Sequence, residues 1–165
     1  MIAEGHPHGE KFREGIDEVR TWWATLRQAL ANRQEALAQN EAAQQYLFDA
    51  SEAEAWMGEQ ELYLMGDEKA KDEQGATNAM KKHELLQKSI ENYASEIRLL
   101  GNRSRTMVES GHPESEAVAS KQSRVDKMYA GLHDLCLERR LRLEEILKLY
   151  SLLREILDLE VLFTL

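Results

Sequence analysis

The stretch 79–107, AMKKHELLQKSIENYASEIRLLGNRSRTM, decides the fold because its mainly apolar stripe recurs at alternating steps of four and three residues. The positions of this stripe are Ala79, His83, Leu86, Ile90, Tyr93, Ile97, Leu100, Ser104 and Met107. Steps of four and three are the heptad pattern of helices that pack side by side in a coiled coil. We therefore predict one long helix from about residue 73 to residue 109, with two polar interruptions in its buried face.

Two further segments show the same rhythm. Before this helix the stripe is Ala43, Tyr46, Ala50, Ala53, Met57, Gln60 and Leu64; after it the stripe is Val118, Gln122, Val125, Tyr129, Leu132 and Cys136. Residues 9–65 contain no strong helix breaker, residues 67–76 form a polar loop, and a third helix is predicted from Pro113 to about residue 163. Since the connections are short, successive helices must run up, down and up. The predicted fold class is all-α, a left-handed antiparallel three-helix coiled-coil bundle.

An internal repeat explains the placement of proline. Pro7 and Pro113 are the two prolines of the chain, they lie 106 positions apart, and each follows Gly-His. The register holds without a gap, because the pairs Val19 and Val125, Trp23 and Tyr129, Leu26 and Leu132, Arg33 and Arg139, and Leu37 and Leu143 share this offset. A fixed period of this kind indicates a repeat architecture. We predict a partial unit over 1–36, a complete unit over 37–142 and a partial unit over 143–165, joined by continuous helices.

Three stretches give this pattern a family resemblance. They are QQYLFDASEAEAWMGEQELY (44–63), KDEQGATNAMKKHELL (71–86) and SRVDKMYAGLHDLCLERR (123–140). Together with the three-helix unit of about 106 residues, they resemble the spectrin repeat family, and most closely a rod segment of β-spectrin. The resemblance covers residues 1 to about 150.

The resemblance implies a structural role. It implies an elastic spacer and protein-interaction module in a cytoskeletal rod, located in the cytoplasm at the inner face of the plasma membrane. The implied partners are α-spectrin, in antiparallel lateral pairing, and ankyrin. Tryptophan in this family resembles a core anchor, so we expect Trp56 and Trp23 to lie in the core. For Trp22 the choice between a core position and a partner-facing position is left open. The expected core anchors are Trp56, Trp23, Tyr129, Leu132, Ile90 and Ile97.

The C-terminal segment departs from the pattern. Thirteen of the 20 residues in 146–165 are apolar, which is more than one exposed helix face needs. Residues 159–163, LEVLF, are similar to the recognition sequence of a viral protease used in expression, although Thr164 departs from it. The alternative to a rod segment is therefore an engineered or truncated repeat fragment that self-associates through its terminal helices. The candidate association surface consists of Leu149, Leu153, Ile156, Leu157 and Phe163.

Composition excludes several classes of function. With 42% hydrophobic and 31% charged residues, the chain can build a core, while its formal charge of −9 argues against nucleic-acid binding. Cys136 is the one cysteine, so an intramolecular disulfide is excluded and a cytosolic compartment is expected. The sequence contains no run of about 18 uncharged apolar residues, so we expect no membrane span. The N-terminal residues show no apolar leader segment, so we expect no secretion signal.

Catalytic and metal sites have little support in the sequence. The five histidines are His6, His8, His83, His112 and His133, and no two have the i, i+4 spacing of a helical metal site. We expect His83 to be a hydrogen-bonded core residue and Cys136 to behave as a small hydrophobic side chain. The LxxLL pattern at 149–153 is discounted in so leucine-rich a helix. We predict no enzyme activity, no cofactor and no metal.

Overall fold

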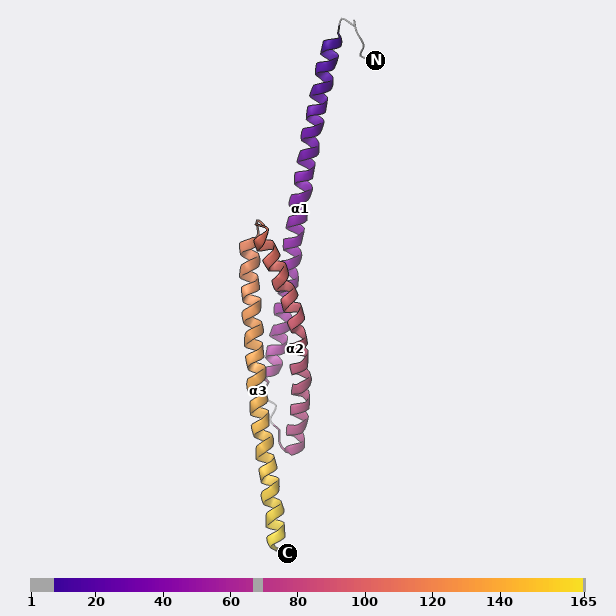
Figure 1. Ribbon diagram of the computed structural model, residues 1–165. Coiled ribbons are helices and arrows are strands. Elements are labelled where there is room, and N and C mark those ends of the chain that lie inside the picture. Colours follow the sequence, from indigo (N-terminus) through magenta and orange to yellow (C-terminus); the bar gives the residue numbers. More distant parts are fainter. Residues whose placement is uncertain (1–7, 67–69, 165) are drawn as a thin grey trace. The chain divides into compact units, whose positions relative to one another are not determined.

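The computed structural model describes residues 8–66 and 70–164, and the regular secondary structure in these ranges is entirely α-helical. The three helices are α1 (Gly9–Met65), α2 (Glu73–Glu109) and α3 (Ser115–Thr164) (Figure 1). The predicted all-α fold with three helices is confirmed. Among the described helices, none combines the length and the apolar character that a membrane crossing requires.

The chain divides into two compact units, one ending at Gln44 and the other beginning at Gln45, and α1 contributes to both. The described part of the first unit is one helix. Its large apolar side chains are exposed, and they are Phe12, Ile16, Val19, Trp22, Trp23, Leu26, Leu30 and Leu37. A single helix has no second element within its own unit on which to bury such a face.

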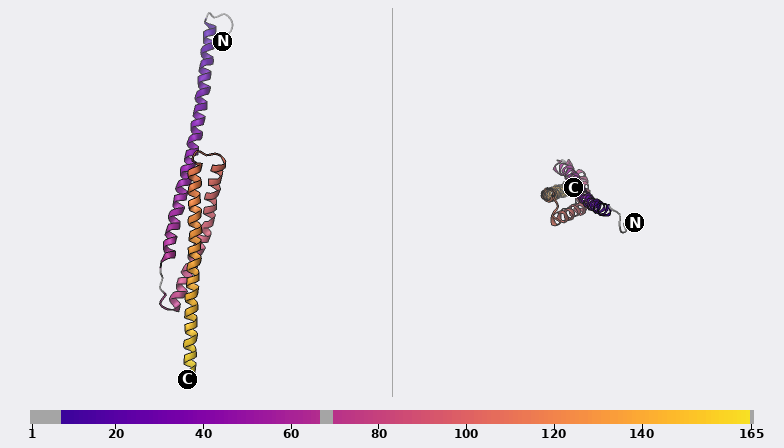
Figure 2. Two further views of the ribbon diagram at one scale, coloured as in Figure 1. Left: turned by 90° about the vertical axis from the view of Figure 1, so that its left-hand side faces the viewer. Right: turned by 90° about the horizontal axis from the view of Figure 1, so that it is seen from above.

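The second unit is a three-helix bundle formed by residues 45–65 of α1 together with α2 and α3. In this unit α2 runs antiparallel to both other helices, and all three lie side by side (Figures 1 and 2). The buried apolar residues of the bundle are Tyr46, Ala50, Ala53, Met57, Leu64, Ala76, Ala79, Ile90, Ile97, Leu100, Val118, Val125, Leu132, Cys136 and Leu143. Ala76 and Leu143 lie just beyond the predicted heptad stripes, and the other residues belong to them, so the seam between the helices is the core.

Local chemistry sets the helix ends on either side of α2. The Asp72 carboxylate accepts a hydrogen bond from the Gly75 N–H at 2.7 Å, which caps α2. Residues 73–76, which the predicted loop and the predicted helix had in common, are helical. At the other end Gly111 adopts a φ of 69°, a left-handed conformation that suits glycine and stops the helix. The third helix begins at Ser115, two residues after Pro113, because its first i, i+4 hydrogen bond runs from the Val118 N–H to the Glu114 carbonyl at 3.0 Å. Ahead of it the Glu114 N–H donates to the His112 ring at 3.0 Å, which satisfies a donor of the first turn.

The third helix continues past Leu143 while keeping contact with the bundle. The Tyr150 hydroxyl donates to the Ala70 carbonyl at 3.0 Å, and Arg154 pairs with Glu73 at 2.6 Å. Every residue from 152 to 164 is exposed. The bundle therefore extends along α3 to about Arg154, and the helix runs on without a break to Thr164.

Candidate functional site

The candidate functional site of this helical bundle is the set of contacts that hold its helices together. At mid-height, Trp56 of α1 stacks on Tyr93 of α2, with ring centroids 3.9 Å apart and an interplanar angle of 16°. Both rings are partly buried against the core. Because stacked aromatic pairs contribute beyond the area they bury, this pair fixes the register of α1 against α2.

The core anchors on α2 and α3 meet beside this stack. Ile90, Ile97 and Leu132 are 1%, 7% and 3% exposed. Tyr129 is partly buried, and its hydroxyl donates to the Ile90 carbonyl at 2.9 Å. This bond satisfies the phenol at the edge of the seam and ties α3 to the backbone of α2.

A buried polar layer crosses the seam near one end of the bundle. The Tyr46 hydroxyl donates to Gln122 Oε1 at 2.7 Å, and Gln122 Nε2 donates to Asp126 at 2.7 Å. Burial raises the pKa of Tyr46 above its ordinary value, so the phenol keeps the proton that it donates. A buried side-chain pair of this kind restricts how α1 and α3 can slide, because any other register leaves polar atoms unsatisfied.

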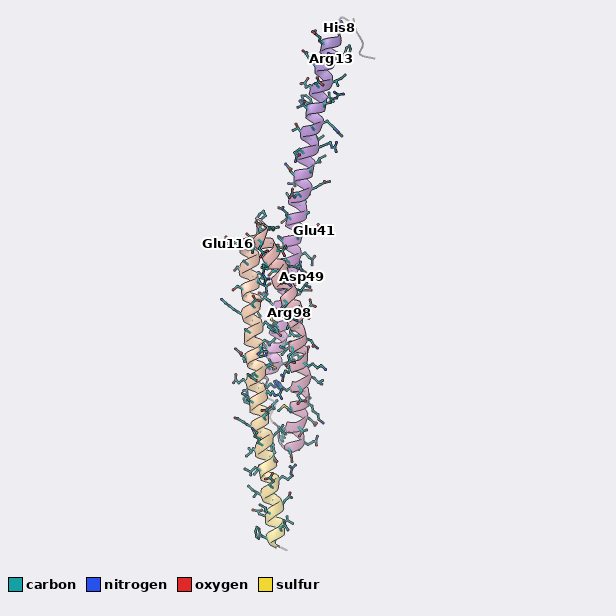
Figure 3. All side chains as sticks on the ribbon, viewed as in Figure 1. His8, Arg13, Glu41, Asp49, Arg98 and Glu116 are labelled. Atoms are coloured by element: carbon teal, nitrogen blue, oxygen red, sulfur yellow. The ribbon has the colours of Figure 1, made fainter. Side chains whose placement is uncertain are left out.

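Ion pairs flank the polar layer. Arg103 of α2 pairs with Asp49 of α1 at 2.5 Å, and Asp49 is labelled in Figure 3. This hydrogen bond from Arg103 lowers the pKa of Asp49 below its ordinary value. Glu54 pairs with Lys121 at 2.8 Å, while the Arg124 Nε lies 3.2 Å from Glu54 Oε1 without hydrogen-bond geometry. Opposite charges thus align α1 with both of its neighbours.

Arg139 forms the contact that the sequence did not predict. Its guanidinium, on α3, donates to the carbonyls of Tyr63, Leu64 and Gly66 at the C-terminal end of α1, the last two at 3.2 and 3.3 Å. The last turn of α1 contains no basic residue of its own. A cation at a helix C-terminus interacts favourably with the helix dipole, and its N–H groups satisfy carbonyls that have no intrahelical partner. The one signal for this role was the pairing of Arg33 with Arg139 at the repeat spacing.

His83 and Cys136 face each other in the core. They are 2% and 4% exposed, and Cys136 Sγ lies 3.9 Å from His83 Nε2. Burial raises the pKa of the Cys136 thiol, so the sulfur is held in its unreactive protonated form. In the part of the chain that the structure describes, no three His, Cys, Asp or Glu side chains are grouped to hold a metal ion.

Several predicted residues lie on the surface. Trp23 is 60% exposed and Trp22 is 68% exposed, so the expected core position of Trp23 is not found in this chain. The reason is that the described part of its unit is a single helix. The predicted association residues are exposed as well: Leu149, Leu153, Ile156, Leu157 and Phe163. His8 is exposed, while His6 and the first Gly-His-Pro lie outside the described residues.

Comparison with known proteins agrees with this geometry. The sequence profile of the spectrin repeat matches residues 41–145. The chain is 49% identical over 160 residues to the spectrin beta chain of Drosophila melanogaster, which covers 97% of this chain and 7% of that protein. It is 44% identical to the erythrocytic spectrin beta chain of Mus musculus, over 92% of this chain and 7% of that protein. It is 42% identical to the non-erythrocytic spectrin beta chain 4 of Homo sapiens, over 93% of this chain and 6% of that protein. The chain belongs to the spectrin repeat family.

Proposed function

We propose that the chain is a structural, non-enzymatic rod segment of a cytoskeletal protein, and that its bundle is an elastic spacer. The observation that carries the proposal is the uninterrupted course of α3 from Ser115 to Thr164, through the core seam and beyond its last contacts. In repeat proteins each unit contacts its immediate neighbours, so a helix shared between units is the element that passes load along the chain. Family membership supports this role, since the relatives are spectrin beta chains.

The predicted division of the chain belongs to the same proposal. In it, residues 37–142 form the complete repeat, while 1–36 and 143–165 are parts of its neighbours. The exposed apolar faces of the two outer segments then pack against helices of adjacent repeats. The match over 160 of the 165 residues includes most of both segments, which favours this interpretation over self-association of a truncated or engineered fragment.

Mechanical unfolding tests the spacer role. A tandem array of the chain, stretched by atomic force microscopy, is expected to unfold in single steps that each release roughly 110 residues, or about 36–40 nm of contour length. Glu145, exposed on α3 between the core and the outer segment, supplies a matched pair of variants. Glu145→Pro should lower the unfolding force because proline breaks the helix, whereas Glu145→Ala should leave it unchanged. Equal forces for both variants would contradict load transfer through α3.

The partners and location are proposed on the resemblance to β-spectrin. They are α-spectrin, paired laterally and antiparallel, and ankyrin, at the inner face of the plasma membrane. Sedimentation of the chain with a purified α-spectrin rod fragment, and separately with an ankyrin fragment, tests both. Binding is compared at low and at high salt, because a contact between opposite charges weakens as salt increases. If neither protein binds at tens of micromolar, the partner assignment is wrong while the spacer role stands.

A further inference from the structure

His83 interrupts the apolar stripe of α2 at a position enclosed by the bundle. It is 2% exposed and lies one heptad step from Ala79, which is 4% exposed. An aliphatic side chain would bury its surface there without needing a polar partner. A titratable group in such a place makes the stability of the bundle depend on its protonation state.

The hydrogen bonding of His83 suits a neutral ring only. Nε2 lies 3.9 Å from Cys136 Sγ, and the buried Nδ1 has no hydrogen-bond partner. A neutral imidazole carries one N–H, whereas the imidazolium carries two. A second N–H at Nδ1 would be buried with nothing to accept its hydrogen bond, so protonation adds an unsatisfied donor as well as a charge.

The charges that face His83 oppose its protonation. Arg139 and Arg140 of α3 lie close enough to act on the ring, while Glu84, its neighbour on α2, acts in the opposite direction. Burial contributes most, and with the two arginines it lowers the pKa of His83 from the ordinary value of 6.5. The ring is therefore neutral near pH 7.

The groove beside His83 reaches the end of α1. It has a volume of about 500 Å³, and α1 lines it with Gln60, Leu62, Tyr63 and Gly66, none of which carries a carboxylate. Lys82 of α2 and Arg139 of α3 also line this groove. The same Arg139 holds the carbonyls at the end of α1. A charge on His83 would thus act on the cation that caps the neighbouring helix.

We infer that protonation of His83 loosens the end of the bundle at which α1 terminates, which makes this contact sensitive to mild acid. The stabilisation by the neutral ring is present above the unfolded-state pKa of about 6.5 and is lost as the pH falls toward the lower folded-state value. The inference is independent of the proposed partners. It adds a chemical condition, proton concentration, to the mechanical role of the bundle.

Urea unfolding between pH 7.5 and 5.0, followed by circular dichroism, tests the inference. Below about pH 6.5 the unfolding equilibrium constant of the wild type should rise by up to about tenfold per pH unit relative to that of His83→Leu, the change expected for one proton. His83→Gln, which keeps a polar side chain that does not titrate, should follow His83→Leu. His133→Gln, at an exposed position on α3, should follow the wild type. Parallel pH profiles for the wild type and both His83 variants would overturn the inference.

Two measurements on the intact wild type complete the test. Nitrogen chemical shifts of the His83 ring should show a folded-state pKa below 6.5, and a value at or above 6.5 would overturn the inference. Hydrogen exchange, corrected for its intrinsic pH dependence, should show residues 60–66 losing protection at pH 5.5 relative to pH 7. Residues 104–110, at the other end of α2, should keep theirs. Equal loss at both ends would overturn the inference, because the effect would not be located at the end where α1 terminates.

Discussion

Replacement of Arg139 by alanine should destabilise the bundle from the end of α1. The side chain is half-buried, and its guanidinium donates to three carbonyls at the C-terminal end of α1, two in its last turn and one directly after it. Hydrogen bonds from a charged donor contribute about 1.5–3 kcal/mol when buried, and a cation at a helix C-terminus about 0.3–1 kcal/mol. Because solvent reaches this site, we expect a loss of about 2 kcal/mol in the free energy of unfolding, at the low end of the combined range.

A loss of that size should appear in both equilibrium and local measurements. For a chain of this length it corresponds to a fall of about 4–8 °C in Tm. Arg139→Lys keeps the charge but loses the fork of donors, so it should fall between Arg139→Ala and the wild type. Hydrogen exchange should locate the loss of protection in the last turn of α1.

The matched control for this prediction is Arg142→Ala, one turn further along α3 at an exposed position. It removes the same charge and the same helix-forming side chain without touching α1. Its effect should stay within about 0.5 kcal/mol, as for ordinary surface substitutions. If Arg139→Ala and Arg142→Ala destabilise the chain equally, the capping interpretation of Arg139 is wrong.

Three further predictions follow from burial and can be checked by urea unfolding or thiol chemistry. Trp56→Ala should reduce the free energy of unfolding by about 2–3 kcal/mol because it removes a stacked, partly buried ring, whereas Trp23→Ala should change it by less than about 0.5 kcal/mol; similar losses would refute the difference in environment. Tyr46→Phe should lose about 1–2 kcal/mol, since the amide oxygen of Gln122 loses its buried donor, and an unchanged stability would show that water replaces the hydroxyl. Cys136 should react with Ellman's reagent at pH 7.5 only as fast as the bundle opens, and fast reaction of the folded chain would contradict the burial of its thiol.

The fold was predictable because local signals and the long-range pattern agree. Residues 9–65 and 73–109 lack strong breakers and repeat their apolar positions at helical spacing, so the bounds of α1 and α2 follow from the sequence. The start of α3 was misplaced by two residues. Proline at position 113 is compatible with a first helical turn, but the first i, i+4 hydrogen bond, from the Val118 N–H to the Glu114 carbonyl, starts the helix two residues later. Periodicity of apolar residues does not reveal at which residue that first bond forms.

The candidate site was less predictable than the fold. In the sequence Arg139 looks like any charged residue in a basic run. Its contact at the end of α1 joins residues 73–76 positions apart in the chain, and it forms only when the two helices pack together. Trp23 shows the opposite difficulty. Its heptad position is that of a core residue, yet burial also requires partner helices, and its unit supplies none among the described residues.

The unbroken course of α3 has a geometric consequence. An α-helix turns by about 100° and advances by 1.5 Å for each residue, so the facing direction of Leu157 relative to the Tyr150 contact is fixed by the number of residues between them. Deleting one residue there would swing the outer apolar face through more than a quarter of a circle while shortening the helix by about 1.5 Å. The number of residues along this helix therefore matters more for the direction in which the outer apolar face points than for the length of the helix. An insertion of seven residues, close to two full turns, would keep that direction, whereas an insertion of one or two residues would not.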